Sequence, residues 1–183
     1  EFAEVSFASG KTLTIEEDFA LPGSKQMNIS GAAGILKTSS IISLAGTLTV
    51  SGANSSLEGG TVALSGGTLQ AENDITIKSD LASQADSSIS VAADKKITYT
   101  GNTLNIGPHS LTLSGAGSFE NTGSLVLDNL TSILSLNGIS KVKNISVVED
   151  LTSGKLQAVD DSEIETLSLS GSSRIDIANQ KKL

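Results

Sequence analysis

Cysteine and tryptophan are absent from the 183 residues, proline occurs twice, and aromatic residues make up only 3%. Without cysteine there is no disulfide framework and no thiolate metal site. A wide globular core relies on Phe, Tyr and Trp side chains, so a core of that kind is not expected. No run of about 18 apolar residues occurs, and therefore no membrane-spanning helix is predicted. These absences favour a narrow interior filled by aliphatic side chains.

Positive charge is also scarce. The chain carries 20 acidic and 12 basic residues, which gives a net charge of −8, and Arg174 is its only arginine. Binding to nucleic acid or to anionic lipid requires clustered positive charge. We therefore expect neither nucleic acid nor a membrane among the partners of this segment.

A short strand signal recurs throughout the chain. At Ser110–Gly115, two leucines alternate with polar residues and a glycine turn follows. The same three-residue pattern occurs nine times, as Val5-Ser6-Phe7, Met27-Asn28-Ile29, Leu48-Thr49-Val50, Leu69-Gln70-Ala71, Ile89-Ser90-Val91, Leu111-Thr112-Leu113, Leu134-Ser135-Leu136, Leu156-Gln157-Ala158 and Ile175-Asp176-Ile177. The steps between these triplets are 19 to 23 residues long. A near-constant period of this length with strands only is typical of a solenoid.

Two further strand sets recur within each period, the first about eight residues after the triplet. Leu13-Thr14-Ile15 and Ile97-Thr98-Tyr99 are examples of the second set, and Ile42-Ser43-Leu44 and Leu104-Asn105-Ile106 are examples of the third. The sequence predicts an all-β fold: a right-handed parallel β-helix of about nine turns of roughly 21 residues, with three strands per turn. Three parallel sheets are expected, with Leu111 and its eight counterparts stacked as one aliphatic column.

A longer period overlies the first. Residues 5–14 match residues 89–98 at an offset of 84, and residues 175–183 begin a third copy. The prediction is therefore one β-solenoid domain over residues 1–183, with internal modules at about 5–88 and 89–174 and a third copy that starts at 175.

Candidate sites for chemistry are few. The acidic clusters Glu16-Glu17-Asp18, Glu149-Asp150 and Asp160-Asp161 could in principle supply a glycosidase carboxylate pair, and Glu72-Asn73-Asp74 could supply calcium ligands. Neighbouring residues on a strand point to opposite faces, so we expect these clusters to be solvated turns. His109 follows Gly107-Pro108 in an expected turn. We predict no catalytic, metal or cofactor-binding residues and no cofactor.

Threonine pairs at Thr12/Thr14, Thr47/Thr49 and Thr98/Thr100 suggest an ice-binding solenoid, which requires threonines on one face over at least four turns. The expected outward row of the first face is instead mixed and polar: Ser6, Asn28, Thr49, Gln70, Ser90, Thr112, Ser135, Gln157 and Asp176. Ice binding is kept as a second alternative.

Glycine-bounded strands such as Gly46–Gly52 and Asn102–Gly107 resemble the β-helical stalks of large bacterial surface adhesins, namely autotransporter passengers and filamentous-haemagglutinin-like proteins. The resemblance implies export, a cell-surface or extracellular location, and a role as a spacer or adhesive rod. No functional residue is carried over from it.

The leading hypothesis is a non-catalytic structural or adhesive segment of a repetitive cell-surface or secreted protein, which is not an enzyme. The expected partners are glycans or a host or neighbouring cell surface, with end-to-end or lateral self-association. The first alternative is a polysaccharide-binding or polysaccharide-degrading β-helix protein.

Overall fold

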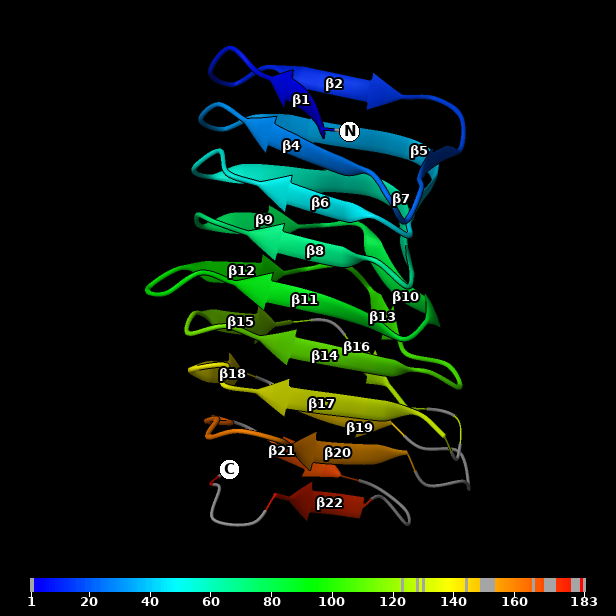
Figure 1. The fold of residues 1–183 in the computed structure, drawn as a ribbon, viewed down its shortest axis with the longest axis vertical. Coiled ribbons are helices and arrows are strands. Elements are labelled where there is room, and N and C mark those ends of the chain that lie inside the picture. The colour runs from blue at the N-terminus through cyan, green and yellow to red at the C-terminus, as the bar shows by residue number, and fades with distance from the viewer. Residues whose placement is uncertain are drawn as a thin grey trace.

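The computed structural model describes residues 2–122, 124–127, 129, 131–143, 145–148, 154–165, 167–169, 174–178 and 182, and these form strands and turns without any helix. The chain winds as a right-handed parallel β-solenoid. In Figure 1 the strands in front run to the left, those behind run to the right, and successive turns descend from the N-terminal to the C-terminal end. The predicted fold class is confirmed. Among the described residues, no helix is long and apolar enough to cross a membrane.

The first face is a sheet of nine parallel strands. In order along the rod they are β1 (Phe2–Ser6), β4 (Gln26–Ser30), β6 (Thr47–Val50), β8 (Thr68–Ala71), β11 (Ser87–Val91), β14 (Ser110–Ser114), β17 (Ile133–Asn137), β20 (Lys155–Ala158) and β22 (Arg174–Ile177). Each of the nine predicted triplets lies on or at the end of one of these strands.

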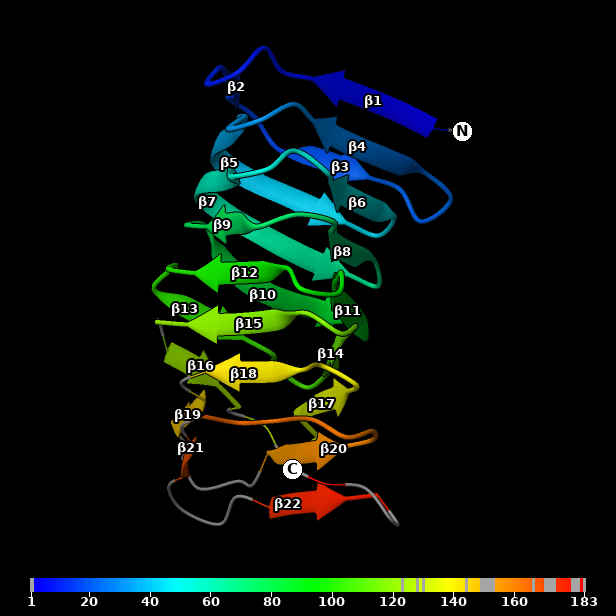
Figure 2. The same ribbon diagram turned by 90° about the vertical axis from the view of Figure 1, so that its left-hand side faces the viewer.

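The other two faces belong to one hydrogen-bonded sheet, not to two separate sheets as expected. The second face contains β2 (Thr12–Ile15), β9 (Ile75–Ile77), β12 (Lys96–Tyr99), β15 (Ser118–Asn121) and β18 (Lys141–Lys143). The third contains β3 (Phe19–Leu21), β10 (Asp80–Ala85), β13 (Thr103–Asn105), β16 (Ser124–Val126), β19 (Ile145–Val148) and β21 (Leu167–Leu169). The long strands β5 (Ile35–Leu44) and β7 (Ser55–Ser65) run along both faces, and their pairing shifts register where they pass the corner. Figure 2 shows the second face in front.

Seven consecutive turns, from β1 to β19, have a strand on all three faces. The stack continues below them with β20, β21 and β22 on fewer faces. Described residues therefore make about seven complete turns, whereas nine were predicted, because the nine triplets count strands of the first face only.

The interior is a set of aliphatic columns. Met27, Leu48 and Leu69 lie directly over one another in register, and all three side chains are buried. Each fully buried aliphatic side chain contributes about 1.5–3 kcal/mol, and this contribution exists only because the next turn covers it. Tyr99 and Phe119 stack with ring centroids 6.2 Å apart, and the Tyr99 hydroxyl donates to the carbonyl of Thr103 at 2.5 Å.

The single column predicted through Leu111 is wrong at two of its eight steps. Val5 pairs with Ile29 and not with Met27. Ile89 pairs with Leu113, so that Leu111 lies against Ser87. The other six steps are as predicted, including Leu111 to Leu134, Leu156 and Ile175.

Both register differences occur beside a glycine. Gly31 and Gly115 each have a φ of +94°, and a Cβ at either position would collide with a backbone carbonyl oxygen, that of Phe7 or that of Val91. Only glycine adopts this conformation and allows this approach without strain. The close approach of each glycine to the preceding turn thus accompanies the two-residue displacement of β4 and β14 from a simple match of triplets.

Two segments of weak local β-propensity nevertheless contain strands. Residues 79–88 are Ala- and Ser-rich, yet they form β10 and the start of β11. Residues 16–26 hold β3 between two turns, and the second turn is closed by a hydrogen bond from the Lys25 N–H to the Pro22 carbonyl. In both places the ladder with the neighbouring turn overrides weak local β-propensity.

Prediction: register tested by disulfides. The pair Ser88→Cys/Thr112→Cys should form a disulfide under mild oxidation, because these residues are direct partners in adjacent parallel strands. Their Cα atoms lie about 4.8 Å apart, within the range that a disulfide spans. The pair Ser90→Cys/Thr112→Cys, displaced by two residues, should stay reduced at about 8 Å. Thiol titration and mass spectrometry report the result. Preferential crosslinking of the displaced pair would contradict the register.

Candidate functional surface

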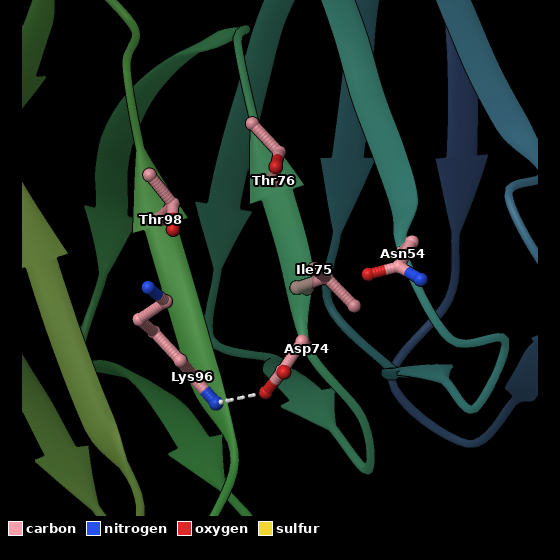
Figure 3. Close-up of a pocket in the computed structure, with 6 residues that line it drawn as sticks. All are labelled: Asn54, Asp74, Ile75, Thr76, Lys96 and Thr98. Carbon is pink, nitrogen blue, oxygen red and sulfur yellow. Dashed lines mark hydrogen bonds between the residues drawn. The ribbon is translucent and has the colours of Figure 1, made fainter.

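The outer surface has open, shallow hollows between successive turns. One, shown in Figure 3, has a volume of about 240 Å³ and lies on the second face, lined by Asn54, Asp74, Ile75, Thr76, Lys96 and Thr98. A second of about 260 Å³ lies on the first face, and a third of about 340 Å³ is lined by residues of β7 together with Lys78, Asp80 and Asn102. All three are lined mainly by polar side chains.

Aspartates at three successive corners, before β9, at the start of β10 and before β11, accept backbone N–H groups of the next turn. The Asp74 carboxylate accepts the backbone N–H of Lys96 at 2.9 Å, the bond drawn in Figure 3. Asp80 accepts from the N–H groups of Asn102 and Thr103 at 2.8 and 3.2 Å. Asp86 accepts from the Ser110 N–H at 2.8 Å. These carboxylates satisfy backbone donors at the corners, where the strand ladder is interrupted.

Residues of the predicted acidic and calcium-ligand clusters also make hydrogen bonds to a neighbouring turn. Asp18 accepts from the Ile41 N–H at 3.1 Å and from the Ser40 hydroxyl, and the hydrogen bond from Ser40 lowers the pKa of Asp18. Asp161 accepts from the Lys182 N–H at 3.0 Å. In the cluster 72–74, the Asn73 amide donates to the Ser51 carbonyl at 2.6 Å.

The cluster Glu149-Asp150 lies outside the described residues. Among the residues that are described, no group of three His, Cys, Asp or Glu side chains could hold a metal ion. His109 lies in the turn between β13 and β14, half-buried, and its backbone carbonyl accepts the N–H of Ile133 at 2.9 Å.

Charge is concentrated on the second face. Five lysines and four glutamates project from it: Lys37, Lys78, Lys96, Lys141, Lys143, Glu58, Glu120, Glu163 and Glu165. Their ion pairs join neighbouring turns, at 2.7 Å for Lys78–Glu58, 3.3 Å for Lys96–Glu120 and 2.9 Å for Lys141–Glu165. Lys143 also pairs with Glu165, at 3.2 Å. Alternation of sign down the face avoids stacking like charges in register.

The ion pairs shift the pKa values of their members. The hydrogen bond from Lys78 lowers the pKa of Glu58. Hydrogen bonds from Lys141 and Lys143 lower the pKa of Glu165, and the bonds to Glu165 and Glu163 raise the pKa of Lys141. These pKa shifts follow from the ion pairs between successive turns of the second face. Exposed pairs of this kind contribute little to stability.

The first face, by contrast, is uncharged over six consecutive strands. From β4 to β17 its two outward rows are Gln26, Thr47, Thr68, Ser88, Thr112 and Ser135, and Asn28, Thr49, Gln70, Ser90, Ser114 and Asn137. We call these twelve side chains the neutral face. The predicted outward row crossed between these two rows at the displaced register, because it followed the second row as far as Ser90 and the first row from Thr112.

The predicted threonine pairs do not share one face. Thr12 and Thr14 belong to β2, Thr47 and Thr49 to β6, and Thr98 to β12. The first row does contain five consecutive hydroxyl residues, but threonine and serine alternate irregularly along it. The described residues thus lack the threonine plane that ice binding requires.

Comparison with known proteins gave no matching family model, no matching curated protein and no matching solved structure. The resemblance to bacterial adhesin stalks therefore stays a prediction. The outward row predicted from the sequence already contained six of the twelve residues of the neutral face. Its division into two rows was missed because that division depends on the register between β11 and β14.

Prediction: pH dependence of Glu58. Because its pKa is lowered in the folded chain, Glu58 stabilises the fold above the pKa of the unfolded chain, about 4.3, and that contribution is lost as the pH falls through the folded pKa. Glu58→Gln should lower the free energy of unfolding by about 0.5 kcal/mol at pH 7. The difference from wild type should shrink as the pH falls below the pKa of the unfolded chain, measured by urea denaturation.

The matched control is Lys78→Met, which removes the first cause of the shift. In that background, Glu58→Gln should have a smaller effect at pH 7. A difference between wild type and Glu58→Gln that is the same at pH 7 and pH 3 would contradict the assigned ion pair.

Proposed function

We propose that the chain is a non-catalytic structural segment, a stiff rod that spaces or displays other parts of a repetitive cell-surface or secreted protein. The observation that carries the proposal is the unbroken parallel ladder of the first face, from β1 to β22. Strands of adjacent turns are bonded in register, and their inward side chains fill columns that are mainly aliphatic. A rod built this way resists bending because bending would break ladder hydrogen bonds on one side.

The exterior supports the same proposal. The hollows are open, and the aspartates that line two of them, Asp74 and Asp80, are engaged by backbone N–H groups of the next turn. A hydrolase needs two carboxylates poised as acid and base, whereas these carboxylates act as corner caps. We propose on this basis that the segment is not an enzyme.

The proposal extends to a tandem array. Local geometry recurs at the offset seen in the sequence: Gly31 and Gly115 share a φ of +94°, and the turns 8–11 and 92–95 are each closed by a lysine N–H donating to an alanine carbonyl at 3.1 Å. We propose modules of about 84–87 residues at 5–88 and 89–174, with a third beginning at 175. Repetition multiplies weak contacts along the rod.

We propose an extracellular or cell-surface location, with glycans or another cell surface as partners. A chain without cysteine needs no oxidative folding step to be stable in that environment.

Prediction: stiffness. Spin labels at Gln26→Cys and Gln157→Cys lie on one outward row, six strand spacings apart, so their backbones are separated by about 29 Å. Double electron–electron resonance should give a single narrow distance distribution near that value after allowance for the label arms. A broad or bimodal distribution would show a hinged chain and would remove the basis for the spacer role. Thr47→Cys/Ser135→Cys, on the same row and four spacings apart, serves as the internal scale.

Prediction: location. Antibodies raised against the 183-residue chain should label intact cells of the source organism or its culture medium, and brief protease treatment of intact cells should remove the cellular signal. A cytoplasmic protein of the same organism, probed in parallel, controls for lysis. Labelling that appears only after permeabilisation would contradict the proposed location.

A further inference from the structure

We propose that the neutral face binds neutral carbohydrate, with one sugar ring seated in the hollow between β8, β11 and β14. The inference rests on the proposed function, because it names the ligand class of the rod's surface. Three separate observations support it: the segregation of charge, the chemistry of the two outward rows, and the position of the hollow.

Charge segregation is the first observation. The neutral face has twelve outward positions without a charge in a chain whose residues are 17% charged, while the second face of the same turns is an ion-pair ladder. Solubility alone would be served by charges on either face. A face free of charge costs less to desolvate and does not attract counter-ions, so it suits an uncharged ligand.

The chemistry of the rows is the second observation. All twelve side chains are hydroxyls or amides, and each of these groups both donates and accepts hydrogen bonds. Thr68 and Ser88 already exchange such a bond across neighbouring strands, with their hydroxyl oxygens 2.8 Å apart. Sugar hydroxyls have the same dual character. A protein partner is disfavoured because interfaces depend on apolar or aromatic anchors, and the twelve positions contain none.

The hollow is the third observation. It has a volume of about 260 Å³ and is lined by Gly66, Gly67, Thr68, Asp86, Ser87, Ser88, Ser110 and Thr112. It lies where β8, β11 and β14 meet, beside the register change that brings Ser87 over Leu111. Gly66 and Gly67 have no side chains, so the hollow is open on their side.

Its size and lining define the ligand. The volume is below the range of about 300–1,000 Å³ that holds drug-sized molecules, so it fits a single ring of a chain that runs over the sheet. Thr68, Ser88 and Thr112 line it with hydroxyl-bearing side chains, and Asp86, whose carboxylate accepts the Ser110 N–H, lines it as well. No aromatic side chain lines it, so affinity arises from hydrogen bonds exchanged with water and is weak for each site, with a Kd on the order of 1 mM.

The test is an NMR titration of the 183-residue chain with cellohexaose, mannohexaose and maltohexaose as neutral probes and hexagalacturonate as the anionic counterpart. We expect saturable shifts with at least one neutral hexasaccharide, centred on the amides of residues 66–68, 86–88 and 110–112. Hexagalacturonate should bind at least about tenfold more weakly, because its carboxylates face Asp86 and a net charge of −8.

Matched variants locate the site. Thr68→Glu fills the hollow with a charged side chain and should weaken binding at least about tenfold, whereas Thr76→Glu, on the second-face strand of the same turn, should leave it unchanged. Both threonines are half-buried and outward-facing. Thr112→Val removes a hydroxyl with little change of shape and should weaken binding while retaining the wild-type thermal unfolding curve.

Several outcomes would overturn the inference: no saturable shift with any neutral hexasaccharide, shifts centred on the second face, equal binding of hexagalacturonate, or wild-type affinity in Thr68→Glu. Concentration-dependent shifts of the same amides without sugar would assign the face to a second copy of the chain instead. The stiffness and location measurements do not involve sugar. A negative sugar titration would therefore contradict carbohydrate binding alone, and a negative stiffness measurement would contradict the spacer role alone.

Discussion

The whole structure depends on burial that no turn can achieve alone. Leu48 is buried because Met27 lies above it and Leu69 below it. A turn taken by itself would expose every one of its inward side chains, so stability accumulates through contacts between neighbouring turns. This constraint accounts for the composition, because the interior accepts mainly aliphatic side chains. Outward side chains do not contribute to the core. Surface chemistry can therefore differ from face to face without cost to the fold.

Much of this arrangement could be predicted from the sequence, and the limit of prediction has a physical reason. Alternation of apolar and polar residues places Leu69 and Ile89 inward whichever partners they have. A shift of one residue would turn every side chain to the other face, but a shift of two leaves the alternation intact. Patterning therefore could not distinguish Leu111 from Leu113 as the partner of Ile89. The observed pairing, with Gly115 in close contact with Val91, is a relation between two turns that no single triplet reports.

The candidate surface was harder to predict for the same reason. Lysines and glutamates alternate down the second face because in-register parallel strands would otherwise place like charges about 4.8 Å apart. On the first face the same problem is solved by neutral residues such as Thr47, Thr68 and Ser88. The alternation of charge can be recognised only when each residue is assigned to its column, whereas the uncharged character of the first face is already visible in the sequence. The acidic excess is not confined to either face: aspartates such as Asp74 and Asp86 lie at the corners, where they accept backbone N–H groups.

These corner bonds also bear on the size of the repeating unit. Asp74 accepts from Lys96, and Asp161 accepts from Lys182 in the same manner, at an offset of 86 to 87 residues. Gly31 and Gly115 recur at 84 residues and mark the two places where the register steps further than elsewhere. The displaced register thus recurs after four turns, which is the length of the tandem modules that we propose.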